Sequence, residues 1–121
     1  MEMRESAENY LEAILMLSRK TDRVRSVDLA DHFGYSKPSI SRAVSLLAEA
    51  GYIERADDGT ITLTSSGTGV AESVYHRHET LTSWLVSIGV DPQTAADDAC
   101  RIEHVISEET FDHIHRQLGE R

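Results

Sequence analysis

The apolar residues in the first part of the chain recur at three- and four-residue spacing, which is typical of helices that bury one face. Residues 6–19 form the first such stretch, and a shorter one lies between Ser26, an expected N-cap, and Gly34, an expected left-handed stop. A third begins behind an expected cap at Ser36, with Pro38 in the first turn, where its missing N–H costs nothing. The pattern predicts three helices.

The pattern then changes to an alternation of apolar and polar residues. Residues 52–55 and 60–63 alternate with period two, and the Asp58-Gly59 pair between them favours a tight hairpin. The predicted order, three helices followed by a hairpin, is that of a winged helix-turn-helix, whose third helix lies in the major groove of DNA. We therefore expect this part of the chain to read DNA.

Helical spacing returns in the second half of the chain. Residues 64–67 are expected to form a break, and one long helix follows it up to Gly89. Asp91, which precedes a proline, predicts the cap of another helix, and we expect that helix to continue through Ile106. Ser107 is expected to cap one last helix.

The long helix carries more apolar residues than a reading head needs for its own core. Trp84 and Leu85 lie on this stretch together with several aliphatic residues. Such a surplus fits a two-fold helical dimer interface, and internal packing alone is the alternative.

Composition is that of an ordinary globular protein. Of the 121 residues, 40% are hydrophobic and 27% are charged, and no run approaches the roughly 20 apolar residues of a membrane span. No basic segment followed by an apolar one begins the chain, so we expect no secretion signal. These features predict a cytoplasmic protein without a membrane partner.

The formal charge of −9 argues against nucleic-acid binding, because Lys and Arg supply the affinity for phosphates. The acid is unevenly spread, however: residues 1–64 hold 8 Lys and Arg against 11 Asp and Glu (−3), and residues 65–121 hold 4 against 10 (−6). A local basic face in the first half therefore remains compatible with DNA binding. The candidate DNA contacts are Arg25, Ser36, Lys37, Pro38, Ser39, Ser41, Arg42 and Arg55.

A candidate metal site lies in the second half. Cys100, Glu103 and His104 have i, i+3 and i+4 spacing, so on one helix they share a face. A thiolate, a carboxylate and an imidazole form a donor set suited to Fe(II), Mn(II), Co(II) or Zn(II). Tertiary packing could complete the site with His78, or with Asn9 and Glu12 from the first helix. Spacing alone leaves a purely structural role for these residues open.

Cys100 and the winged helix are also compatible with functions other than metal-dependent repression. A Cys–His pair also suggests a nucleophile with its base, but no orienting third group is evident, so we do not expect an enzyme. The main alternative is a winged-helix regulator that senses thiol oxidation or a small ligand through Cys100. A protein-interaction module that does not read DNA is a third possibility.

Four segments of the chain resemble the diphtheria-toxin-repressor and manganese-transport-regulator family of metal-dependent repressors. They are residues 8–14, 36–41, 77–81 and 98–107. The last segment, Asp-Ala-Cys-Arg-Ile-Glu-His-Val-Ile-Ser, is the most specific, because it resembles the family's metal-binding helix almost letter for letter. The resemblance runs nearly from end to end.

The resemblance implies a repressor of metal-homeostasis genes that binds double-stranded operator DNA as a homodimer when metal is bound. By position, Cys100, Glu103, His104 and His78 match ligands of the family, and Glu12 matches a carboxylate of its manganese-responsive branch. In this interpretation, metal ties the first helix to the ligand helices and favours a separation of the reading heads that matches successive major grooves.

Two positions depart from the family pattern and bear on the choice of metal. Asn9 stands where the iron branch usually has Met and the manganese branch has Asp. Thr82 stands where the iron branch has a further carboxylate, so that branch's ancillary site is not assigned here. We predict Fe(II) as the metal and Mn(II) next, with Co(II), Ni(II) or Zn(II) as surrogates.

Together these observations predict a mainly α fold with a small β-hairpin. Residues 1–66 are expected to form a winged helix-turn-helix DNA-binding domain. Residues 67–121 are expected to form a helical dimerisation and metal-binding domain.

Overall fold

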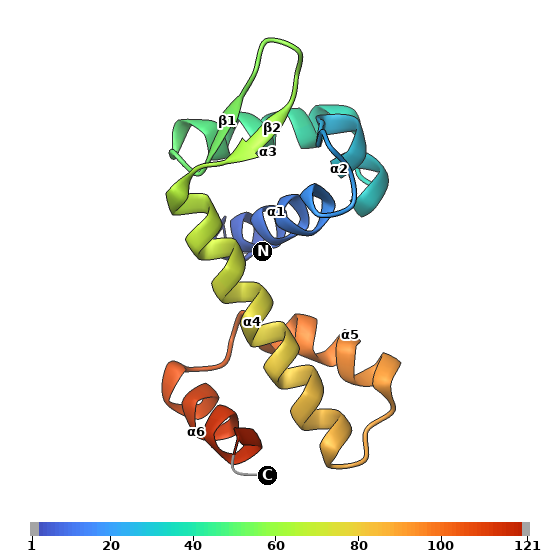
Figure 1. The fold of residues 1–121 in the computed structure, drawn as a ribbon. Coiled ribbons are helices and arrows are strands. Elements are labelled where there is room, and N and C mark those ends of the chain that lie inside the picture. Colours follow the sequence, from blue (N-terminus) through green and yellow to red (C-terminus); the bar gives the residue numbers. More distant parts are fainter. Residues whose placement is uncertain (1–2, 120–121) are drawn as a thin grey trace. The chain divides into compact units, whose positions relative to one another are not determined.

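The computed structural model describes residues 3–119 and divides into two compact units, Met1–Glu72 and Ser73–Arg121. Its elements, in chain order (Figure 1), are α1 (Met3–Ser18), α2 (Ser26–Phe33), α3 (Lys37–Glu49), β1 (Ile53–Arg55), β2 (Ile61–Leu63), α4 (Ser65–Ser87), α5 (Pro92–Ile102) and α6 (Glu108–Gly119). The predicted class, mainly helical with one hairpin, is confirmed. The boundary between the units falls within α4.

The first unit is built on three helices that share one core. Its most completely buried side chains come from all three helices, and each is at most 1% exposed: Leu11, Ile14, Leu29, Ile40 and Val44. α2 packs against both α1 and α3. The periodicity of the sequence therefore identified the face of each helix that is removed from water.

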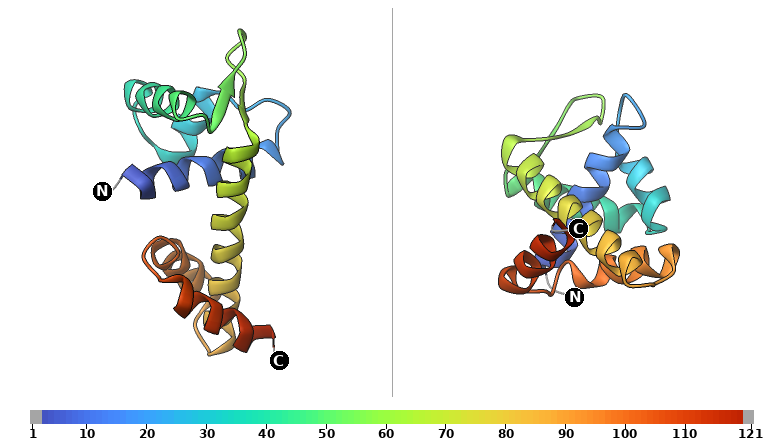
Figure 2. Two further views of the ribbon diagram at one scale, coloured as in Figure 1. Left: turned by 90° about the vertical axis from the view of Figure 1, so that its left-hand side faces the viewer. Right: turned by 60° about the horizontal axis from the view of Figure 1, so that its bottom comes forward.

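The hairpin completes the first unit and projects beyond its helices (Figures 1 and 2). β1 and β2 are antiparallel, with Ile53 opposite Leu63. Gly59 has a φ of 89°, a conformation that glycine adopts without strain, so the predicted tight turn is confirmed. The N–H of Ile61 donates to the carbonyl of Val24 at 2.8 Å, which ties the hairpin to the segment between α1 and α2.

The expected signals around α3 are confirmed. Ser36 is its N-cap, and the Oγ of Ser36 accepts a hydrogen bond from the N–H of Ser39 at 3.3 Å. Gly34, at the end of α2, has a φ of 71°, and its N–H donates to the carbonyl of Ala30 at 2.8 Å. Together these two devices end α2 and start α3 within a few residues.

The predicted cap of α2 is wrong. Ser26 is the first residue of the helix, and Arg25 holds the N-cap position. The N–H of Arg25 donates to the carboxylate of Asp28 at 2.8 Å. An acid in the first turn thus satisfies the backbone here and interacts favourably with the helix dipole.

The predicted break at residues 64–67 is also wrong, because α4 begins at Ser65. Thr64 is placed to cap the helix: its Oγ1 donates to the carbonyl of Gly51 at 2.7 Å and accepts from the N–H of Gly67 at 3.1 Å. A Cβ on Gly67 would collide with the backbone carbonyl of Tyr52. Gly67 therefore allows the first turn of α4 to pack against the chain entering the hairpin.

The predicted extent of α5 is too long. The helix ends at Ile102 rather than running through Ile106. Two hydrogen bonds favour this earlier end. The carbonyl of Ile106 accepts a hydrogen bond from Nη2 of Arg77 at 2.8 Å. The hydroxyl of Ser107 accepts a hydrogen bond from the N–H of Thr110 and caps α6. The expected caps at Asp91 and Ser107 are confirmed.

The second unit has a small apolar core. Its buried apolar side chains are Val74 and Leu81 of α4 with Ala95 and Ala99 of α5. Within the described part of the chain, α6 has no fully buried residue, and Ile88, just after α4, is 56% exposed. None of the described helices is long and apolar enough to cross a membrane.

We expect Gly67→Ala to lower the free energy of unfolding by about 1–3 kcal/mol, because the new methyl group meets a fixed backbone carbonyl. Gly69→Ala is the matched control, since a Cβ there meets nothing within 4 Å in the same helix. That change should stabilise the protein by about 0.5–1 kcal/mol through helix propensity. Urea unfolding curves measure both, and equal effects of the two substitutions would contradict the packing role of Gly67.

Candidate functional site

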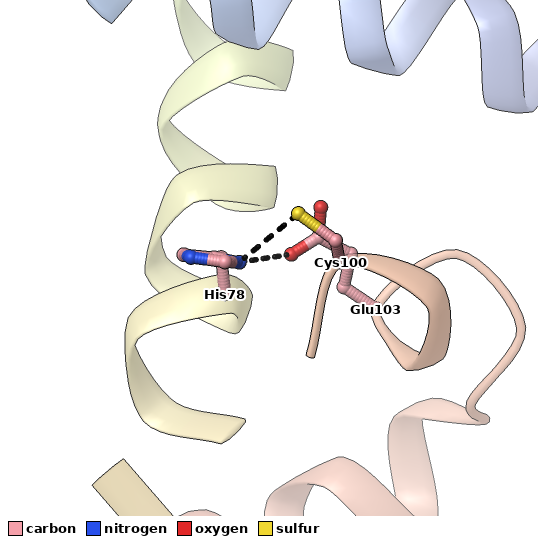
Figure 3. A group of neighbouring side chains, drawn as sticks. All are labelled: His78, Cys100 and Glu103. Carbon is pink, nitrogen blue, oxygen red and sulfur yellow. Dashed lines mark hydrogen bonds and ion pairs between the residues drawn. The ribbon is translucent and has the colours of Figure 1, made fainter. Parts of the chain in front are cut away.

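Three side chains of the second unit converge at one point (Figure 3). His78 comes from α4, Cys100 from α5, and Glu103 from the C-cap of α5, and one potential ligand atom of each lies within 4.8 Å of the others. The Nδ1 of His78 is 3.3 Å from a carboxylate oxygen of Glu103 and 3.8 Å from the Sγ of Cys100. We refer to these three residues as the triad.

Glu103 is the most constrained member of the triad. Its side chain is 0% exposed, and neither carboxylate oxygen has a hydrogen-bond partner. Oε2 faces His78, and Oε1 lies 3.3 Å from the Nε2 of His104, whose side chain is 2% exposed. An ionised carboxylate buried without hydrogen bonds carries a large desolvation cost, which a positive charge beside it, from an imidazolium or from a metal ion, would offset.

The triad fits a divalent metal ion. Donors that share one ion at bond lengths of about 2.0–2.3 Å lie about 3–4 Å apart, which is the range of the separations from His78. An imidazole, a thiolate and a carboxylate form a borderline set that accepts Fe(II), Mn(II), Co(II) or Zn(II). Cys100 is the exposed member of the triad, His78 is partly buried and Glu103 is buried.

The other predicted ligands are placed less simply. His104 lies in the turn after α5 rather than on the helix, and it contacts the second oxygen of Glu103. Asn9 and Glu12 are on α1, in the first unit, with Glu12 buried and Asn9 partly buried. Their role as ligands stays a prediction.

Arg77 is a further neighbour of the site, and the sequence analysis assigned it no role of its own. Its side chain reaches the turn that carries Glu103 and His104, and it lies over the ring of Phe111. The signals in the sequence are its position directly before His78 and its place at the start of the family-like segment 77–81.

The candidate DNA contacts in the first unit form an exposed face on α3. Ile40, Val44 and Leu47 point into the core, which turns the opposite side of the helix to solvent. The exposed residues in the first turns and at the cap are Ser36, Lys37, Pro38, Ser39, Ser41 and Arg42. Short hydroxyls and two cations suit hydrogen bonds to phosphates and base edges.

Arg25 and Arg55 are exposed outside α3, and the tip of the hairpin is acidic. The Nη1 of Arg55 is 3.5 Å from the hydroxyl of Ser45 on α3, which holds its side chain near that helix. At the tip, the backbone N–H of Thr60 donates to Asp58 and keeps the pKa of that carboxyl below its usual value. The carboxylate puts negative charge at the tip, so the positive charge of the candidate DNA contacts lies on Arg25, Lys37, Arg42 and Arg55 instead.

Comparison with known proteins assigns the family. Residues 2–61 match the sequence model described as the iron dependent repressor, N-terminal DNA binding domain. Residues 64–121 match the one described as the iron dependent repressor, metal binding and dimerisation domain. The chain therefore belongs to the iron-dependent repressor family, and the predicted resemblance is confirmed. This is a family of transcriptional regulators, not of enzymes.

Individual relatives agree with this assignment. The transcriptional regulator MntR of Escherichia coli O157:H7 is 36% identical over 109 residues, which is 90% of this chain and 70% of that protein. An uncharacterised helix-turn-helix regulator of Methanocaldococcus jannaschii is 29% identical over 114 residues, 93% of this chain and 91% of that protein. Similarity to MntR extends through both units.

Solved structures confirm the fold. A manganese-dependent transcriptional repressor in complex with manganese superimposes with a TM-score of 0.85 at 31% identity, covering 93% of this chain and 52% of that one. The IdeR protein of T. acidophilum gives a TM-score of 0.81 at 24% identity, covering 93% and 53%. The chain thus spans about half the length of these solved relatives.

We expect Cys100→Ser and Glu103→Gln each to weaken Co(II) binding by more than about tenfold, or about 1.4 kcal/mol. Cys100→Ser should also remove the sulfur-to-cobalt charge-transfer absorption, because the thiolate is its source. Asp98→Asn is the control, since Asp98 lies on α5 and pairs with Arg101 outside the triad. Anaerobic titrations followed by absorbance measure all three, and wild-type affinity in either triad variant would exclude a metal centre there.

Proposed function

We propose that this chain is a metal-dependent transcriptional repressor that binds double-stranded operator DNA as a homodimer when Fe(II) or Mn(II) is bound. The observation that carries the proposal is the buried carboxylate of Glu103, which has no hydrogen bond and faces His78 and Cys100. The first unit of the same chain has a winged helix-turn-helix fold. We propose metal-homeostasis genes as its targets, because a regulator that responds to a metal serves to control the supply of that metal.

The proposal divides the chain by function. Residues 1–66 read DNA, and residues 67–121 bind metal and dimerise, a division supported by the residues matched by the two family models. We infer a cytoplasmic location, since a repressor of this kind acts on the chromosome.

The proposed ligands are His78, Cys100, Glu103 and His104, with Asn9 and Glu12 of α1 as further ligands carried over from the family. A bound divalent ion would place a positive charge beside the buried carboxylate of Glu103 and so offset the cost of its burial. His78 and Glu103 then hold α4 and the end of α5 together, since each belongs to one of these elements. Metal thereby shifts the population toward the conformation that binds DNA, by the difference in its affinity for the two states.

We rank Fe(II) first and Mn(II) second. The thiolate of Cys100 is a softer donor than a carboxylate and favours iron over manganese. Manganese is supported by one solved relative, a manganese-dependent transcriptional repressor in complex with manganese. Co(II), Ni(II) and Zn(II) act as surrogates in binding experiments.

The homodimer is supported by the composition of the second unit. Half of its buried apolar side chains are alanines, which contribute little buried area. Val86, Ile88 and Val105 are 40%, 56% and 77% exposed. A second copy of the chain would remove such surface from water, with the same patch used on both subunits.

Sedimentation velocity tests the homodimer. We expect a species of twice the monomer mass at micromolar concentration, and a shift toward monomer in Ile88→Glu, because a charge then lies on the apolar surface. Glu79→Gln, at an exposed position on α4, is the control. A wild-type protein that sediments as a monomer at all concentrations, with metal and without, would remove this part of the proposal.

Fluorescence anisotropy tests repression directly. A promoter fragment from the protein's own gene neighbourhood is titrated with anaerobic protein, with and without Fe(II) and Mn(II). We expect binding that requires metal, and the ion active at the lower concentration identifies the co-repressor. Tight binding without metal that is lost on treatment with peroxide would replace the proposal with a thiol sensor acting through Cys100.

The proposed DNA contacts are Arg25, Ser36, Lys37, Pro38, Ser39, Ser41, Arg42 and Arg55. We expect Lys37→Ala to weaken operator binding and to reduce the slope of log affinity against log salt by about 1, because one phosphate contact is lost. Arg42→Ala should weaken binding as well. Arg116→Ala removes a cation from α6 and should change neither quantity. Unchanged binding in both α3 variants would contradict the assignment of α3 as the reading helix.

A further inference from the structure

We propose that Arg77 is a positioning residue of the metal centre: it holds the turn that carries Glu103 and His104 in place against α4. This inference rests on the proposed function, because it concerns the same metal site. Arg77 is not itself a ligand.

The guanidinium of Arg77 makes two contacts with segments that follow α5. Nη2 donates to the carbonyl of Ile106 at 2.8 Å, a link between residues 29 positions apart. The central carbon lies 5.3 Å from the centre of the Phe111 ring, in the geometry of a cation–π contact. One side chain of α4 therefore contacts both the turn after α5 and the first turns of α6.

The turn is fixed both through its side chains and through its backbone, with Glu103 fully buried and the side chain of His104 2% exposed. Its own hydrogen bonds are local: the N–H groups of Val105 and Ile106 both donate to the carbonyl of Ile102. Val105 is 77% exposed and adds little packing. Besides the 3.3 Å pair between His78 and Glu103, the hydrogen bond from Arg77 joins this turn to α4.

The position of Arg77 in the chain connects these contacts to the proposed metal ligands. Arg77 directly precedes His78, and Ile106 follows Glu103 and His104 by three and two residues. The hydrogen bond from Arg77 to Ile106 therefore helps to set the distance between α4, which carries the proposed ligand His78, and the turn that carries Glu103 and His104. Displacing the turn would change the 3.3 Å separation between His78 and Glu103.

The charge of Arg77 distinguishes positioning from electrostatics. A guanidinium repels a cation, so removing it would strengthen metal binding if charge were its only influence. Positioning predicts the opposite sign, because loss of an outer partner that orients ligands typically weakens metal binding by about 10–100-fold. The sign of the change thus decides between the two.

The test uses the full chain and Co(II) as the probe. Arg77→Met should raise the dissociation constant for Co(II) by about 10–100-fold and shift the visible d–d bands, because the ligands are held differently. Arg77→Lys keeps a donor for the Ile106 carbonyl and should recover part of the affinity. Arg101→Met is the matched control: Arg101 lies beside Cys100 in sequence, but its side chain is 82% exposed, and affinity and spectrum should be unchanged.

Hydrogen exchange of the metal-free protein gives an independent readout. The amides of Val105 and Ile106 should exchange faster in Arg77→Met than in wild type, and at the wild-type rate in Arg101→Met. Unchanged exchange, or Co(II) binding by Arg77→Met that equals or exceeds wild type, would overturn the role of Arg77. If wild type itself binds no Co(II), Fe(II) or Mn(II), the proposed function fails instead, and the two failures are therefore separable.

Discussion

The carboxylate of Glu103 is the constraint around which the second unit is arranged. It has no exposed surface and no hydrogen bond, so its burial is tolerable only with positive charge beside it. His78 approaches one oxygen and His104 the other, and the Sγ of Cys100 lies 3.8 Å from the Nδ1 of His78. A hydrophobic residue at this position would stabilise the fold more simply, and this cost supports the proposal that the site holds a cation.

Sequence patterns predicted the fold well because most of its signals are local. The cap at Ser36 and the turn at Gly59 each depend on residues within a few positions, and both are observed. The errors arose where a competing group decides. Asp28 displaces the expected cap of α2, and the hydrogen bond from Arg77 helps to end α5 early from 29 residues away. Periodicity contains no information about such distant partners.

The candidate site was predictable in part for the same reason. Spacing brought Cys100 and Glu103 together correctly, although the chain leaves the helix at Glu103. His78 was offered as a ligand that tertiary packing could supply, and the family resemblance supported it, because local spacing does not link it to residues more than twenty positions away. The net acidic charge was the least informative signal, because it does not show where on the surface the charges lie. α3 exposes Lys37 and Arg42, and Arg23 partly offsets Asp58 at the hairpin tip.

The exposure of Cys100 has a kinetic consequence. Of the three triad residues, Glu103 has no exposed side-chain surface and the side chain of His78 is 23% exposed, whereas Cys100 is an exposed residue. An ion held there can leave, or be taken by a competing chelator, without prior unfolding of the second unit. For the proposed metal centre, occupancy would then follow the free concentration of the metal in both directions, as reversible reporting of a changing supply requires.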